Sequence, residues 1–204
     1  MGTTVNNVHV YVGAELSAED VAAVVAQPAL VAPPEAGWVS VFPQAEEFGD
    51  DTLAVELSAA LRRPAVSFFC FDSDIGIAVL IADGEVVDQL VVSWPGYMEE
   101  MMGDAAEAGA DVSGGLPGGE LLPGVTCEME IKVDLDAWVS VLESQVTHAA
   151  VIDAVNADRD SPFADRVSSA ILGRFGIAPG KLLGAYRFWV RGEDPDLVKT
   201  FLRT

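Results

Sequence analysis

The segment from Ala65 to Trp94 constrains the fold of this chain more than any other. It contains three apolar runs, which are interrupted once by Asp72-Ser73-Asp74 and once by Asp83-Gly84. An Asp-Gly pair between two β-branched runs predicts a hairpin with a two-residue loop, because both turn positions of a type I′ turn need φ > 0. The expected pairs are Ala82 with Glu85, Ile81 with Val86, and Val79 with Asp88.

The predicted hairpin has two apolar faces, because side chains alternate across a strand. One face is expected to carry Ile75, Ile77, Val79, Ile81, Val86, Leu90 and Val92. The other is expected to carry Gly76, Ala78, Leu80, Ala82, Val87 and Val91. Two apolar faces are typical of strands that are covered on both sides. The second face has the smaller side chains, so a helix would approach it closely, and the segment predicts the buried centre of a sheet.

The preceding residues predict a strand over 5–12, a helix after Ser17 and an extended connection where prolines cluster at 28–34. A second strand over 37–42 and a second helix over 52–62 follow. The order is then β-α-β-α-β-β-β, an α/β fold with α+β character. Right-handed crossovers would make parts of the sheet parallel and place these helices on one face. Because the hairpin adds antiparallel strands, a mixed sheet is expected.

The C-terminal part predicts a half-exposed strand over 125–133, then a helix capped by Asp134 or Asp136 that runs through Leu142 and on to Val155. A helix starting at Pro162 should turn its apolar residues inward. These inward residues are Phe163, Val167, Ile171 and Leu172. A last strand over 185–190 and a short helix over 195–202 would follow. We expect one domain over 1–204, with a mixed-sheet core at 1–96, a flexible Gly/acid-rich insert at 97–124 and a strand-helix part at 125–204.

The charge of the chain is unevenly distributed. The net charge is −21. Residues 1–131 hold two bases and 22 acids, a net −20, whereas residues 132–204 hold nine bases and ten acids, a net −1. Such a charge repels nucleic-acid phosphates and acidic membranes, so we expect neither as a partner. It favours a basic partner; solubility and adaptation to salt are the alternative explanations.

No apolar run approaches the roughly 18 residues of a membrane span. The N-terminal residues match neither a secretory signal nor a myristoylation pattern, so a cytoplasmic location is expected. Two cysteines, Cys70 and Cys127, make no metal or disulfide framework. We therefore expect no cofactor and assign no metal ligand.

The most site-like feature is the Asp72-Ser73-Asp74 turn at the end of a central strand. Two carboxylates there would bind Mg²⁺ or Ca²⁺ or share a proton, but the favoured interpretation is a turn whose carboxylates accept backbone hydrogen bonds. Trp94 and Tyr97 lie beside a methionine-rich stretch that would form an adaptable contact surface. The expected binding residues are Asp72, Asp74, Trp94 and Tyr97. No catalytic residue is assigned, because no G-x-S-x-G elbow is present and His9 and His148 are isolated.

The string FDSDIGIAVLIADGEVVDQLVVSWPGY, preceded by GWVSVFPQ and LSAALRRPAVSFF, resembles a bacterial α/β family of unknown activity. The shared features are a WVSV strand, an Asp-Ser-Asp turn, an Asp-Gly hairpin ending in Val-Asp, and a Pro-x-Tyr segment. The stretch FGIAPGKLLGAYRF is similar to the ending of that family. The resemblance covers about half of the chain and departs at the Gly-rich insert and around Ile75 to Val79, where the family has aromatic residues. It implies no catalytic residues.

These observations favour a non-enzymatic acidic cytoplasmic protein that binds another protein, a basic one, in an immunity-like or regulatory role. Two other classes stay open. One is a metal-assisted hydrolase or transferase that uses Asp72 and Asp74. The other is an assembly protein that oligomerises through sheet edges, and the sequence leaves the oligomeric state undetermined.

Overall fold

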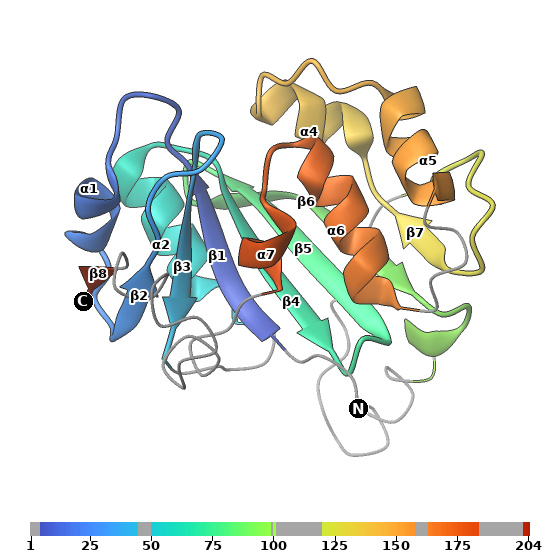
Figure 1. Cartoon of the computed structure of the whole chain (residues 1–204), viewed down its shortest axis with the longest axis horizontal. Helices are drawn as coiled ribbons and strands as arrows, with labels where there is room; N and C mark the ends of the chain where they lie inside the picture. The colour runs from blue at the N-terminus through green and yellow to red at the C-terminus, as the bar shows by residue number, and fades with distance from the viewer. Residues whose placement is uncertain (1–4, 45–49, 99, 101–119, 158–162, 184–201) are drawn as a thin grey trace.

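A computed structural model describes residues 5–44, 50–98, 100, 120–157, 163–183 and 202–204. Its centre is an eight-stranded sheet with the strand order β7-β6-β5-β4-β1-β3-β2-β8. Helices cover both faces of this sheet (Figure 1). The α/β fold expected from the sequence is confirmed.

In the first half of the chain the elements follow the predicted order with one added strand, β2, between the first helix and the second predicted strand. The strands are β1 (Val5–Tyr11), β2 (Ala29–Val31), β3 (Trp38–Pro43), β4 (Ala65–Phe71), β5 (Ile75–Ala82), β6 (Glu85–Ser93), β7 (Glu130–Lys132) and β8 (Leu202–Arg203). The helices are α1 (Ala18–Ala22), α2 (Thr52–Leu61), α4 (Leu135–Val141), α5 (His148–Ala157), α6 (Ala164–Arg174) and α7 (Pro179–Leu182). Ser17 caps α1 as predicted, in a reciprocal capping box with Asp20.

The seven strand pairings of the described chain are all antiparallel, so the parallel pairs expected from the crossovers are not found among them. The reason is an inserted strand. The crossover through α1 joins β1 to β2, which run in the same direction but have β3 between them. The crossover through α2 joins β3 to β4, with β1 between them. The first four strands therefore adopt the split β-α-β-β-α-β arrangement.

The Asp83-Gly84 turn has φ values of 51° and 81°, as a type I′ turn requires. Ala82 pairs with Glu85 and Ile81 with Val86, both as predicted. The third predicted pair is wrong, because a β-bulge shifts the register between Leu80 and Ile81. Asp88 therefore pairs with Leu80, not with Val79.

The bulge also exchanges the two faces of β6 beyond the turn. Leu90 and Val92 pack in the same core cluster as Ala78 and Leu80, opposite to the predicted assignment. Val91 packs instead with Ile75 and Met98. An extra residue in one strand changes which side chains face each side, and alternation read from the sequence does not reveal it.

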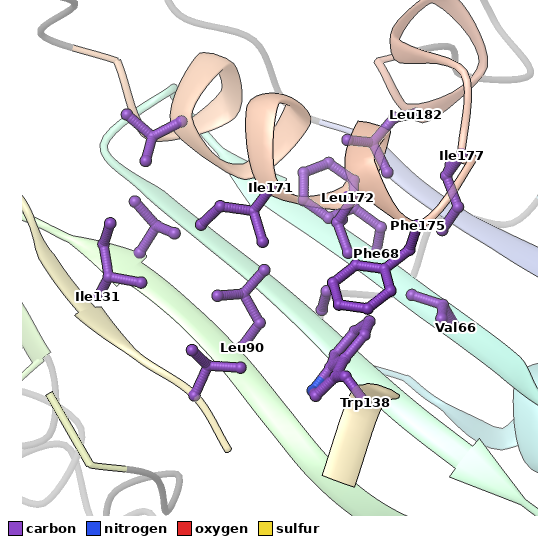
Figure 2. Close-up of a cluster of buried hydrophobic side chains, with 14 of the residues drawn as sticks. Val66, Phe68, Leu90, Ile131, Trp138, Ile171, Leu172, Phe175, Ile177 and Leu182 are labelled. Atoms are coloured by element: carbon purple, nitrogen blue, oxygen red, sulfur yellow. The ribbon is translucent and has the colours of Figure 1, made fainter. Parts of the chain in front are cut away.

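Two apolar clusters cover the two faces of the sheet. Helices α1 and α2 close one face over β1, β3, β4 and β5, as predicted for helices on a single face. Helices α4 to α7 close the other, where Ile171 and Leu172 of α6 pack against Phe68 and Leu90 of the sheet (Figure 2). Both faces are thus buried over most of the predicted sheet centre, and the hydrophobic effect on this burial is the main source of stability. The prediction is wrong next to the turn, where Val86 and Val87 of β6 are 52% and 42% exposed.

The close helix approach predicted for the face with small side chains occurs at Gly76. A Cβ at this position would lie 2.4 Å from Ser168 Oγ and 3.4 Å from Ala164 O, both on α6. Helix α6 therefore packs on β5 at a point where only glycine fits without a shift.

Several boundaries differ from the predictions. The proline-rich connection contains a strand, β2, because its backbone pairs with β3. Strand β7 is shorter than the 125–133 predicted. The helix expected to run from Asp134 to Val155 is two helices, separated by a turn in which Glu143 has φ = 47°. Phe163 precedes α6 and is exposed, not inward.

The strand predicted at 185–190 and most of the helix predicted at 195–202 lie outside the described residues, as does the insert over 99 and 101–119. Within the described residues, no helix combines the length and apolar character needed to cross a membrane. The division of the chain into one domain with an insert stays a prediction.

Candidate functional site

A cleft of about 650 Å³ lies beside the β7 edge of the sheet. Residues 120–122 run along the outer side of β7, where Leu122 N donates to Ile131 O at 2.8 Å and Val133 N donates to Glu120 O at 3.1 Å. This pairing places one wall of the cleft opposite the first turn of α4. The lining residues are Asp88, Glu120, Leu121, Leu122, Pro123, Val133, Asp134, Leu135, Asp136 and His148.

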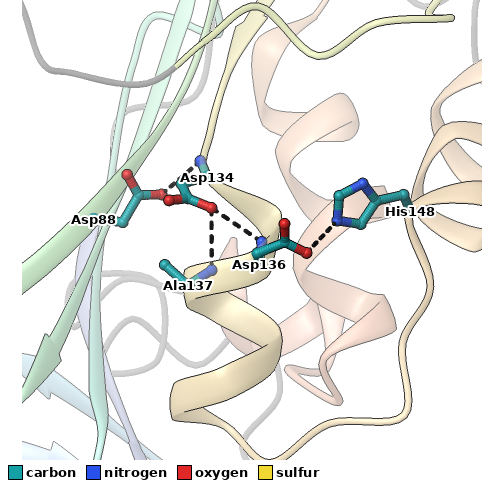
Figure 3. Close-up of polar contacts among 5 residues, drawn as sticks. All are labelled: Asp88, Asp134, Asp136, Ala137 and His148. Carbon is teal, nitrogen blue, oxygen red and sulfur yellow. Dashed lines mark hydrogen bonds and ion pairs between the residues drawn. The ribbon is translucent and has the colours of Figure 1, made fainter.

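Asp134 shapes the cleft by capping α4, as the sequence predicted. Its Oδ1 accepts hydrogen bonds from Asp136 N and Ala137 N, both at 3.1 Å (Figure 3). A side chain that satisfies these otherwise free N–H groups fixes the start of the helix. The position of Asp136 follows from this cap, because Asp136 lies in the first turn of α4.

Asp88 connects the sheet to the same helix. Its Oδ2 accepts from Trp138 Nε1 at 2.8 Å and from Asp134 N at 3.0 Å. Burial raises the pKa of Asp88 above its usual value, and the hydrogen bonds from Asp134, Trp138 and Gln89 oppose that rise. The Asp88 carboxylate therefore has two roles: it holds α4 against β6 and it lines the cleft.

His148 and Asp136 form the outer rim. His148 Nε2 lies 3.0 Å from Asp136 Oδ1, and the exposed side-chain fractions are 52% and 88% (Figure 3). This contact joins the first residue of α5 to α4 across the loop between them. Because both side chains are solvated, the contact contributes little to stability, and both groups remain accessible to a ligand.

The lining of the cleft combines negative charge with apolar surface. Four carboxylates line it, and no lysine or arginine is among its described lining residues. Of the leucine and valine residues in the lining, Leu121 is 59% exposed, whereas Leu122, Val133 and Leu135 are buried. Such a lining suits a cation on an aliphatic stem, since the stem contacts the apolar part and the charged end meets the carboxylates.

No family model matches the chain, and neither does any curated protein or solved structure. The function of this chain is therefore inferred from the geometry of its described residues.

The Asp72-Ser73-Asp74 turn lies at the end of β4, and its first two residues have φ values of 48° and 65°. Ser73 ties the turn to α6: its Oγ donates to Asp165 Oδ2 at 3.3 Å, and its O accepts from Ala164 N at 2.8 Å. Two successive non-glycine residues in the left-handed region are strained, and these contacts hold the conformation.

The structure brings Tyr97 toward this turn but places Trp94 elsewhere. Burial raises the pKa of Tyr97, and the negative charges of Asp74 and Asp72 raise it further. Tyr97 packs on the small cluster of Ile75, Val91 and Met98, whereas the half-buried Trp94 packs on the large cluster under α6. The two aromatic residues predicted to bind together therefore contact different faces of the sheet.

Within the described chain, no three acidic, histidine or cysteine residues are grouped so that they would hold a metal ion. A hard cation needs about six oxygen ligands, most of which would have to come from water or substrate. The metal-assisted reading stays a prediction that the structure does not test.

A second polar group lies inside the fold. Ser40 Oγ lies 2.9 Å from His9 Nδ1, and His9 Nε2 lies 2.7 Å from Asn7 Oδ1. All three residues are buried, with His9 and Asn7 at 0% exposure. Burial lowers the pKa of His9 to about 3, so its ring is neutral at neutral pH. The order resembles a serine nucleophile with its base, but a side chain so enclosed is out of a substrate's reach.

Neither the acidic cleft nor the buried Ser40–His9–Asn7 group was predicted from the sequence. The cleft is built by residues from β6, the 120–123 segment, α4 and α5, whose contacts depend on how β7 docks on β6. A partial signal existed in Asp134 and Asp136, which were recognised only as helix caps. The polar residues Asn7 and His9, two positions apart in a strand that is expected to be buried, were the signal for the buried group.

Proposed function

We propose that this chain is a non-enzymatic protein that binds a basic protein partner, and that a lysine or arginine side chain of the partner enters the acidic cleft. The observation that carries the proposal is the cleft lining, which combines four carboxylates with an apolar part. A partner side chain placed there would meet Glu120, Asp134 and Asp136 with its charge and cover the exposed Leu121 with its stem.

The charge of the whole chain supports the same proposal. A net −21, with −20 of it in residues 1–131, creates a field that attracts a basic partner over distances longer than a direct contact. The same field disfavours nucleic-acid and acidic membrane partners. An immunity-like inhibitor of a basic toxin or nuclease in the cytoplasm is one concrete form of this function.

Affinity capture from native lysate tests the proposal. The immobilised chain is incubated at about 50 mM and about 300 mM salt, bound proteins are identified, and the association rate of the purified partner is measured across this range. The proposal predicts a partner of high isoelectric point whose association slows steeply with salt, because screening shortens the reach of the field. An acidic partner, or an association rate that does not change with salt, would contradict it.

A further inference from the structure

The segment containing α7 is fixed to the sheet by polar side chains that are fully inside the fold. Asn7 Nδ2 of β1 donates to Leu182 O at 2.5 Å and lies 3.5 Å from Lys181 O. Trp38 Nε1 of β3 donates to Phe175 O at 2.9 Å, just before this segment. Both attachments are made to backbone carbonyls, so they depend on the position of the segment and not on its side-chain identity.

The hydrogen bonds of Asn7 determine where the proton of His9 lies. Because the Asn7 amide nitrogen donates to Leu182 O, its Oδ1 faces His9 and acts as an acceptor. His9 Nε2 must therefore carry the proton, and Nδ1 accepts from the Ser40 hydroxyl. The chain of donors runs in one direction: Ser40 O–H to His9, His9 Nε2–H to Asn7, and Asn7 Nδ2–H to the α7 backbone.

A second proton on His9 does not fit this arrangement. It would sit on Nδ1 and face the Ser40 oxygen, so the serine would lose its acceptor, and a positive charge would be buried at a site with 0% exposure. Strands β1, β3 and β4 carry no acid to compensate that charge; their other titratable groups are Tyr11 and Cys70. The charged group on α7 is Lys181, which is itself cationic and has Glu35 as a counter-charge.

We propose that the Ser40–His9–Asn7 chain is an acid-sensitive latch that holds α7 against β1 at neutral pH and favours its detachment in acid. When α7 moves away from β1, the Asn7 amide loses its carbonyl acceptor, and His9 next to it becomes solvated and takes up a proton near the ordinary pKa of an imidazole. Acid thus favours the detached state, because only that state accommodates the charged ring. The latch is independent of the acidic cleft and of the partner proposed for it.

Hydrogen exchange of the full chain, followed by mass spectrometry at pH 7.5 and pH 5.0, tests the latch. After correction for intrinsic exchange, the amides of residues 177–183 should be less protected than those of β4 and β5. Their opening constant should rise about 30-fold at the lower pH, as expected for a ring that titrates near 6.5 only when detached. The proposal would be overturned if residues 177–183 exchange only when β4 and β5 exchange as well, which would mean that α7 does not open separately. It would also be overturned if the opening constant rises less than threefold.

The variant His9→Gln removes the titration and keeps a polar side chain, so its opening constant should not change between the two pH values. NMR of the wild-type ring nitrogens gives a second test that needs no variant. The latch predicts a neutral ring with its proton on Nε2 at pH 5.0. A native-state ring that titrates near pH 6.5, or that carries its proton on Nδ1, would overturn the proposal.

Discussion

The indole N–H of Trp138 donates to the Asp88 carboxylate at 2.8 Å, across the contact between α4 and β6. Trp138 is 1% exposed, whereas Asp88 is half-buried and lines the cleft. One carboxylate therefore joins the buried core to the candidate binding site. The Trp138 indole should consequently report on events in the cleft without being part of its surface.

Removing the Asp88 acceptor should destabilise the fold. In Asp88→Ala the buried Trp138 N–H loses its partner, and a buried donor without a partner costs about 1–3 kcal/mol. Asp88→Asn keeps an oxygen for the indole and should lose less. Denaturant unfolding measures both free energies. Equal losses for the two variants would show that the hydrogen bond to Trp138 is not the cause.

The contact between Gly76 and Ser168 predicts a rescue. Gly76→Ala places a methyl group within 2.4 Å of Ser168 Oγ, which should cost about 1–3 kcal/mol. Ser168 Oγ has no hydrogen-bond partner in the described structure, so Ser168→Ala alone should be neutral or stabilising. The double variant should regain most of the loss, because only Cβ of residue 168 then remains, at 3.4 Å. Thermal unfolding measures the stability of the three variants. If the change in stability of the double variant equals the sum of the two single changes, this packing is contradicted.

The buried His9 predicts a stability that decreases in acid. Its pKa is lowered to about 3 in the folded state, so between pH 6.5 and 3 the unfolded chain binds the extra proton. The stabilising contribution is therefore complete above pH 6.5 and is lost as the pH falls toward 3. Between pH 7.5 and 5 the loss should be about 2 kcal/mol, and it should be absent in His9→Gln. Urea unfolding of both proteins at these two pH values measures the difference.

The sequence predicted those parts of the fold that depend on local signals. The Asp83-Gly84 turn, the Ser17 cap and the apolar runs of β4 and β5 each have a local cause, and each is found in the structure. The bulge in β6 has no such signal, because Val86 and Val87 are equally suited to either face. The position of the extra residue in β6 depends on the strand that pairs with β6 and on the helices that cover it, and these are distant in sequence.

The site was less predictable than the fold. Asp72 and Asp74 are adjacent in sequence and could be recognised as a pair, but the cleft combines Asp88 with Asp134, which are 46 residues apart. Their contact follows from β7 docking on β6, a long-range event that neither composition nor periodicity encodes. Likewise, Asn7 reaches Leu182 only because α7 returns over β1.

The central claim, that the cleft receives a basic side chain, is tested most directly through Trp138. The indole ¹⁵N–H resonance of Trp138, assigned with Trp138→Phe, is followed while acetyl-Leu-Arg-Leu-amide is added, with acetyl-Leu-Glu-Leu-amide as the control peptide. One variant reduces the charge of the cleft with Glu120→Gln and Asp136→Asn and keeps Asp88, the acceptor of the reporting indole. A matched variant makes the same change in charge at exposed positions outside the lining, with Glu19→Gln and Asp153→Asn.

We predict a saturable shift with the arginine peptide and none with the glutamate peptide. The shift should weaken with salt, disappear in the cleft variant and persist in the matched variant. An indole resonance that does not respond to the arginine peptide, or that responds equally in both variants, would contradict the assignment of the cleft as the binding site.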